Sequence, residues 1–212
     1  MKTGVLFDLD GTLLNTLEDL TDSVNYALAQ YDCPPRTVEE VREFIGNGAR
    51  KLIERSLPGR EDDPAVSEVL ATYQAYYKTH SKIKTKPYDG ILQALTEVSA
   101  KYPVAIVSNK PDAATKVLCK EFFGDIYARG ESDDCPRKPA PDMLQKAMGI
   151  IGVDSCIYVG DSEPDIQTAK NLGVKCLSVL WGFRDQETLQ AAGGKYFCED
   201  PAKLLENLES LM

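Results

Sequence analysis

The 212-residue chain lacks several features that define large classes of protein. Its longest apolar stretches are strand-sized runs such as Val104–Val107, whereas a membrane-spanning helix needs about 20 apolar residues in succession. It contains no run of lysine or arginine, and 33 acidic against 24 basic residues leave a net charge of -9, the wrong sign for a nucleic-acid binder. No small-residue cleavage site follows Met1-Lys2, so we expect no signal peptide. Together these absences favour a cytoplasmic protein with no nucleic-acid and no membrane partner.

Histidine is nearly absent, and the six cysteines are scattered without a C-x-x-C pair. A zinc site needs clustered cysteine and histidine, but His80 is the only histidine. A Ser-His-Asp or Cys-His mechanism would depend on that one residue, and no G-x-S-x-G turn supports it. We therefore expect a solvated surface position for His80 and reduced thiols that pack in the interior.

The residues that are present divide into two patterns. The chain is 43% apolar and 27% charged, which is typical of a globular protein of one or two domains. After an apolar strand at Val5–Phe7, helical periodicity extends from about residue 16 to residue 81. Thr16 with Asp19 resembles a capping pair, and Thr37 with Glu40 forms a capping box. Two further helices are expected, one ending at Pro58-Gly59 and one opened by Asp63-Pro64.

Beyond Pro87, strands alternate with helices, a pattern typical of parallel βαβ units. The sequence therefore predicts an α/β fold, a doubly wound, Rossmann-like parallel sheet that also contains the first strand. The expected domains are an α/β core of residues 1–14 and 84–212 and an inserted all-helical domain of residues 15–83. Within the core, strands are expected at 103–107, 156–159, 174–179 and 196–197, and a weaker apolar stretch lies at 125–128.

Polar residues follow several of these strands, at the edge where ligands bind in an open parallel sheet. They are Asp8, Asp10, Ser108, Asp161 and Asp165, with Lys138 in the loop that leads into a core helix. Four carboxylates at one edge repel each other and require a divalent cation, and ligands that are all oxygen suit Mg²⁺. The lysine and the serine can bind phosphoryl oxygens. Each residue alone could be a turn, a cap or a surface charge, but their joint placement favours a site for magnesium and phosphate.

The same residues give the chain a strong resemblance to the haloacid dehalogenase superfamily. Four motifs occur in the family's order, namely DLDGT (8–12), VSNK (107–110), RKPAPD (137–142) and GDSEPD (160–165). The helical insert is similar to the small cap domain of subfamily I. The segments IGNGARKLI (45–53) and VLWGF (179–183) are similar to those of the phosphoglycolate phosphatase-like members. The resemblance covers nearly the whole chain.

The resemblance implies a role for each site residue. Asp8 is the nucleophile that forms an aspartyl-phosphate, and Asp10 protonates the leaving group and then activates water. Mg²⁺ is held by the Asp8 carboxylate, the Asp10 main-chain carbonyl and Asp161, with Asp165 as a further ligand or just behind the metal. The residues implied in substrate binding at the strand ends are Thr12, Ser108, Asn109 and Lys138. Because dehalogenases lack the second acid, Asp10 favours phosphoryl transfer.

The implied function is a magnesium-dependent phosphatase for a small phosphorylated metabolite, with 2-phosphoglycolate as the expected monoester. A β-phosphoglucomutase-like mutase, an inorganic pyrophosphatase and a non-catalytic binding protein remain alternatives. We hypothesise that Arg50, or else Lys51, contacts a carboxylate of the leaving group, although a solvated arginine in a helix–helix turn would explain Arg50 equally well. A monomer or a weak homodimer is expected.

Overall fold

The computed structural model describes residues 2–57 and 65–212, and the chain divides into two compact units. The first unit comprises Met1–Asn15 and Pro87–Met212, and the second comprises Thr16–Lys86. The sequence predicts these junctions at 14/15 and 83/84, whereas the structure has them at 15/16 and 86/87. The expected helix end at Pro58-Gly59 and the helix start at Pro64 lie outside the described residues.

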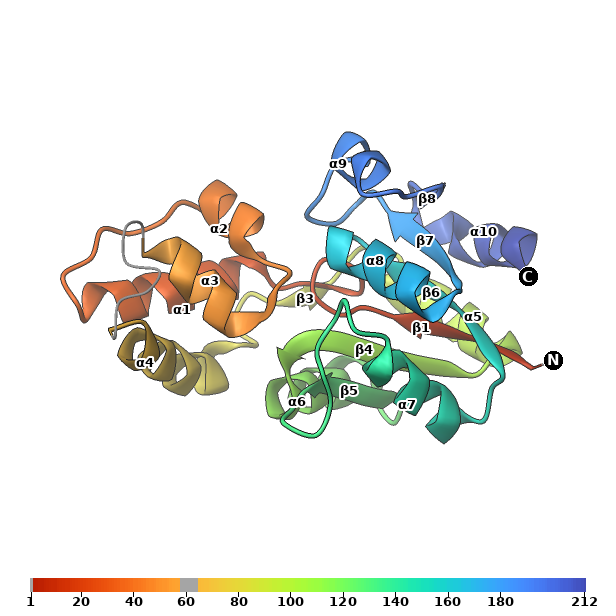
Figure 1. Cartoon of the computed structure of the whole chain (residues 1–212), viewed down its shortest axis with the longest axis horizontal. Helices are drawn as coiled ribbons and strands as arrows, with labels where there is room; N and C mark the ends of the chain where they lie inside the picture. Colours follow the sequence, from red (N-terminus) through yellow and green to blue (C-terminus); the bar gives the residue numbers. More distant parts are fainter. Residues whose placement is uncertain (1, 58–64) are drawn as a thin grey trace. The chain divides into compact units, whose positions relative to one another are not determined.

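The first unit is built on a six-stranded parallel sheet with the order β5-β4-β1-β6-β7-β8 (Figure 1). Its strands are β1 (Thr3–Phe7), β4 (Val104–Pro111), β5 (Tyr127–Glu131), β6 (Ser155–Gly160), β7 (Lys175–Val179) and β8 (Tyr196–Cys198). Two short strands, β2 (Leu14–Asn15) and β3 (Lys86–Pro87), pair with each other. The predicted doubly wound parallel sheet is thereby confirmed.

Helices cover both faces of this sheet because successive strand residues alternate between two apolar cores. Val5 and Phe7 of β1 belong to one core and Leu6 to the other. The first core includes residues of α5 (Ile91–Lys101), α6 (Asp112–Phe123) and α10 (Leu204–Leu211), and the second includes residues of α7 (Asp142–Ile151) and α8 (Glu163–Leu172). The central strands are buried on both sides, which fixes their register.

Some elements differ from those expected. Strand β4 extends to Pro111, past the expected end at residue 107, and the register of its pairing with β5 shifts between Val107 and Pro111. The irregularity carries three polar residues onto the end of the strand. The short helix α9 (Gln186–Ala191) was not expected. Its N-cap, Asp185, accepts a hydrogen bond from the Thr188 amide.

The second unit is helical as predicted, and its described helices are α1 (Leu17–Ala29), α2 (Val38–Phe44), α3 (Gly48–Ser56) and α4 (Ala65–His80). Helix α1 packs against α2 and α4, and α3 packs against α2 and α4. His80 is half-buried, since its ring stacks on Tyr76 at 3.7 Å between centroids, so the expectation of a solvated histidine was wrong. None of the helices in residues 2–57 and 65–212 has the length and apolar character needed to cross a membrane.

The two predicted caps in this unit have different outcomes. The box of Thr37 and Glu40 is confirmed, with hydrogen bonds in both directions. The pairing of Thr16 with Asp19 is wrong, because Thr16 adopts φ -104° and ψ 1°, away from the extended conformation in which an N-cap side chain reaches the next amides. The Asp19 carboxylate accepts hydrogen bonds from the amides of residues 83–85 instead.

Candidate active site

Strand order brings the predicted site residues of the first unit together. Strand β1 lies between β4 and β6, so the carboxyl ends of these three strands are neighbours. The Asp8 amide, one residue beyond β1, donates a hydrogen bond to the Val159 carbonyl of β6 at 2.8 Å. Asp161 directly follows β6, and Ser108 lies near the end of β4. Asp8, Ser108 and Asp161, which are far apart in the sequence, therefore meet at one edge of the sheet.

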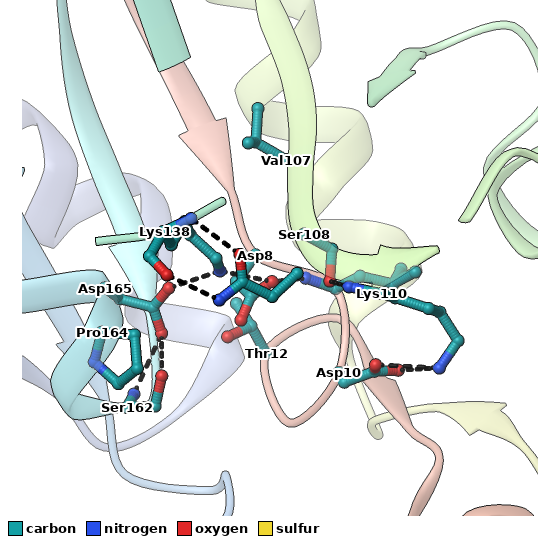
Figure 2. A network of polar contacts seen from close by, with 12 residues as sticks. Asp8, Asp10, Thr12, Val107, Ser108, Lys110, Lys138, Ser162, Pro164 and Asp165 are labelled. Atoms are coloured by element: carbon teal, nitrogen blue, oxygen red, sulfur yellow. Dashed lines mark hydrogen bonds and ion pairs between the residues drawn. The ribbon is translucent and has the colours of Figure 1, made fainter. Parts of the chain in front are cut away.

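Lys138 is the centre of the polar network in Figure 2. Its ammonium nitrogen lies 2.9 Å from Asp8 Oδ1 and 2.7 Å from Asp165 Oδ1, and it donates to the Tyr158 hydroxyl at 2.9 Å. The Tyr158 hydroxyl in turn donates to the Val107 carbonyl at 3.0 Å. Lys138 is 2% exposed, so this network lies almost entirely out of water.

Asp165 has partners on both carboxylate oxygens. Oδ1 contacts Lys138, and Oδ2 accepts from the backbone amide of Ser162 at 3.1 Å and from its hydroxyl. Asp165 therefore links the first turn of α8 to the buried lysine. A substituent on Gly160 would overlap the Asp165 side chain, which makes glycine necessary there.

Asp161 is held by hydrogen bonds from two other segments, those of Thr12 and Phe183. Its Oδ1 accepts from the Thr12 hydroxyl at 2.9 Å, and its Oδ2 accepts from the Phe183 amide at 2.8 Å. A Cβ at Gly11, which has φ +81°, or at Gly182 would collide with the Asp161 carboxylate group or its Cβ. Thr12, predicted to bind substrate, is thus placed so that it orients Asp161.

Burial dominates the electrostatics of the acids. It raises the pKa of Asp8 from 3.8 to about 7, although Lys138 opposes the shift and Asp165 adds to it. The pKa of Asp161 is raised well above its usual range by burial and by the charges of Asp165 and Asp8. Burial lowers the pKa of the Lys138 ammonium, but the charges of Asp165 and Asp8 outweigh it, and the net shift is upward. The lysine is therefore a permanent cation.

The carboxylates are suited to a divalent cation. One oxygen from each of Asp8, Asp161 and Asp165 lies within 4.8 Å of the others, and all three residues are buried. Lys138 pairs with Asp8 and Asp165, whereas Asp161 is held by neutral donors, and a divalent ion would balance the resulting excess of negative charge. The donor set is all oxygen, as Mg²⁺ prefers. The Asp10 carboxylate is not part of this cluster, so only its main-chain carbonyl remains as the predicted ligand.

The Asp10 side chain instead forms an ion pair that the sequence did not predict. Lys110 Nζ lies 2.8 Å from Asp10 Oδ2 and 3.0 Å from Oδ1. A lysine just before a helix start is usually solvated, which is why Lys110 was overlooked. The available signal was its position two residues after Ser108, on the same strand end. Tyr158 was also overlooked, because a tyrosine in an apolar strand fits a core residue equally well.

Ser108 and Asn109 have different partners. Ser108 is buried, with 2% of its surface exposed, and its hydroxyl accepts a hydrogen bond from the Lys110 amide at 3.3 Å. The Asn109 side chain donates to the Lys138 carbonyl at 3.0 Å and accepts from the Lys138 amide at 2.8 Å. Asn109, predicted to bind substrate, is therefore placed so that it fixes the backbone of Lys138.

Arg50 and Lys51 lie in helix α3 of the second unit, and both contact Glu54. Arg50 Nε is 3.0 Å and Lys51 Nζ is 2.5 Å from a Glu54 oxygen. Arg50 also donates to the Ser67 hydroxyl at 3.4 Å. The side chain of Arg50 is 53% exposed, which leaves its guanidinium accessible. Its contact with a leaving group stays a prediction.

Comparison with known proteins adds a family and several relatives. The model of the haloacid dehalogenase-like hydrolases matches residues 5–179. Phosphoglycolate phosphatase 1 of Pseudomonas aeruginosa is 32% identical over 220 residues, which cover 98% of this chain and 78% of that protein. A phosphoglycolate phosphatase of Cereibacter sphaeroides is 34% identical, with coverage of 85% and 86%. A crystal structure from Lactobacillus delbrueckii subsp. bulgaricus, provisionally named phosphoglycolate phosphatase, has a TM-score of 0.91 at 36% identity and covers 98% of this chain and 99% of that one.

Proposed function

This chain belongs to the haloacid dehalogenase-like hydrolase family, and we propose that it is a magnesium-dependent phosphatase that hydrolyses 2-phosphoglycolate or a closely similar small monoester. The observation that carries this proposal is the buried contact of Lys138 with both Asp8 and Asp165 at the strand ends. The names of the curated relatives support 2-phosphoglycolate as the substrate. These names do not favour a mutase or a pyrophosphatase as the function of this chain.

Magnesium would be held by Asp8, Asp161 and Asp165, together with the main-chain carbonyl of Asp10. When bound, it would neutralise charge on the phosphoryl oxygens. The remaining chemistry belongs to the side chains of the protein.

Asp8 is the proposed nucleophile. Its Oδ1 accepts from the Leu9 amide at 2.7 Å and contacts Lys138, which leaves Oδ2 as the proposed attacking atom. A bond forms between Oδ2 and phosphorus, and the bond from phosphorus to the ester oxygen breaks. Asp10 gives its proton to that oxygen. Asp10 then removes a proton from water, the water oxygen attacks phosphorus, and the bond to Asp8 breaks to release phosphate.

Lys138 and Ser108 are proposed to stabilise the phosphoryl group during both transfers. Lys138 supplies a full positive charge in a buried site, where electrostatic stabilisation is strongest. The Ser108 oxygen accepts from the Lys110 amide, so its own proton can be directed at a phosphoryl oxygen. Thr12 and Asn109 act through Asp161 and Lys138. We assign the helical unit as the cap domain, with Arg50 as its contact to the leaving group, and a cytoplasmic setting.

The test is phosphate release by the purified protein with MgCl₂ from 2-phosphoglycolate, β-glucose 1-phosphate, a nucleoside monophosphate and pyrophosphate. We expect the highest kcat/KM with 2-phosphoglycolate. The Asp8→Asn variant keeps the shape of the side chain and should lose at least about 10³-fold in kcat, as happens when a nucleophile is removed. Retention of most activity in this variant would exclude the covalent mechanism. Turnover of the sugar phosphate to an isomer, without phosphate release, would favour a mutase.

A further inference from the structure

Each of the two acids of the DLDGT segment is paired with a different lysine. Lys138 contacts Asp8, and Lys110 contacts both oxygens of Asp10, as Figure 2 shows. The Lys110 side chain is 2% exposed and the Asp10 side chain 13% exposed, so their ion pair is largely removed from water. A contact with both carboxylate oxygens restricts rotation of the carboxylate as well as its position.

The backbone that carries Lys110 is itself fixed. The Lys110 amide donates to Ser108 Oγ at 3.3 Å, and the Thr115 hydroxyl lies 3.2 Å from the Lys110 carbonyl. Gly130 of the neighbouring strand lies so close to this carbonyl that a Cβ there would overlap it. The lysine therefore extends from an anchored segment of β4 toward Asp10.

We propose that Lys110 is a positioning residue for Asp10, a role that rests on the proposed function of this site. Asp10 lies two residues from Asp8, and negative charge on Asp10 opposes ionisation of Asp8. Without a cation beside it, the Asp10 carboxylate would rotate away from the neighbouring acids. Lys110 holds it where it can reach the ester oxygen. In this role Lys110 acts through the Asp10 carboxylate, which its ammonium contacts at 2.8 and 3.0 Å.

The test compares Lys110→Met with the wild-type chain on two substrates. The leaving group of 2-phosphoglycolate is a basic alkoxide that needs a proton from Asp10, whereas p-nitrophenolate is a weak base and leaves without one. We expect Lys110→Met to lower kcat/KM for 2-phosphoglycolate by about 10²-fold, the loss typical of a misplaced catalytic group, with KM nearly unchanged. The loss of kcat/KM with p-nitrophenyl phosphate should be less than about tenfold. Lys110→Arg, which keeps the charge, should recover part of the activity.

Two controls separate positioning from a general loss of structure. Lys116→Met removes an exposed lysine that pairs with Asp112 on α6 and should leave both substrates unaffected. In an Asp10→Asn background, Lys110→Met should cause little further loss, because both changes disable the same group. Equal losses of kcat/KM on both substrates, additive losses in the double variant, or a raised KM with unchanged kcat would each overturn the inference. If the wild-type chain hydrolyses no phosphate ester, the proposed function fails instead.

Discussion

Tyr158 provides the third acceptor for a single ammonium group. An ammonium has three N–H donors, and Lys138 directs them at Asp8, Asp165 and the Tyr158 hydroxyl. The hydroxyl proton in turn goes to the Val107 carbonyl, so the tyrosine connects β6 to β4 beneath the site. Burial, followed by the charges of Asp165 and Asp8, raises the pKa of this phenol well above its usual range, so the neutral hydroxyl persists.

We expect Tyr158→Phe to lower the free energy of unfolding by about 1–3 kcal/mol, because it leaves a buried carbonyl and a buried N–H without their partner. The effect on kcat should stay within about threefold, since the two carboxylates still hold Lys138 by charge-assisted contacts. Urea denaturation and phosphate-release assays measure the two quantities. Tyr196→Phe on the more exposed strand β8 is the matched control and should change neither. A large loss of kcat with unchanged stability would show that the hydroxyl takes part in the reaction.

Single residues differ in how far the sequence reveals them. Asp8 stands out because a charge next to an apolar strand needs an explanation, whereas Lys138 is a loop lysine that only its motif and its joint placement with the other residues reveal. Tyr158 does not stand out, since it satisfies the apolar pattern of β6 and only its buried hydroxyl reveals the second role. Lys110 is overlooked for the opposite reason, because a lysine before a helix needs no buried partner.

Helix α1 shows how one side chain organises an element. Asp19 lies in its first turn and is 2% exposed. Its carboxylate accepts from three consecutive amides, those of Ile83, Lys84 and Thr85, at 2.9–3.1 Å. The start of α1 is therefore tied to the last residues of the same helical unit. Such hydrogen bonds to a buried charge are stronger than those between neutral groups.

Removal of this carboxylate should destabilise the helical unit. We expect Asp19→Ala to lower the free energy of unfolding by about 2–4 kcal/mol, because three amides lose a charged acceptor at once. Hydrogen exchange should show loss of protection at the amides of residues 83–85. Asp22→Ala is the control, since Asp22 also contacts Lys84, but through an exposed ion pair that solvent screens, so its loss should change the free energy of unfolding much less. Equal effects of the two substitutions would contradict the assigned role of Asp19.

The sequence predicts helix and strand boundaries correctly where the residues that determine them are close together in the chain. The capping box of Thr37 and Glu40 spans three residues and is confirmed, whereas the partners of Asp19 lie 64 to 66 residues further along the chain. No local pattern indicates such a contact. Strand β4 was predicted too short because its last residues are polar and serve the site rather than the core.

At the scale of the whole chain, alternation of strands and helices predicts a parallel sheet but does not fix which strands are neighbours. The order places β1 between β4 and β6, and this order brings motifs from distant segments together. It also brings Asp8, Asp161 and Asp165 close together, in a chain whose net charge is already -9. The net charge predicts that nucleic acid is not a partner, whereas the local excess of acids favours binding of a divalent cation.

This local excess makes the stability of the metal-free chain dependent on pH. The pKa of Asp8 is 3.8 in the unfolded reference and about 7 in the folded chain, so between these values the folded state binds more protons. The contribution of Asp8 to stability is therefore complete below about pH 4 and is lost as the pH rises through about 7. Asp161, whose pKa is also raised, acts in the same direction. A cation that binds only the folded state offsets this loss by mass action.

Asp8→Asn isolates this effect, because the amide is neutral at every pH in the range. In EDTA, we expect Asp8→Asn to raise Tm above that of the wild-type chain by about 4–8 °C near pH 8, and by much less near pH 5, where Asp8 is already protonated. MgCl₂ should raise the wild-type Tm near pH 8 and reduce the difference. Asp125→Asn removes the same unit of charge at a 93% exposed side chain. Its Tm difference from the wild-type chain should depend neither on pH nor on MgCl₂. This control separates an effect of the buried acids from an effect of net charge. If the difference between wild type and Asp8→Asn is independent of pH, then the acids around Lys138 do not carry the uncompensated charge that a magnesium site requires.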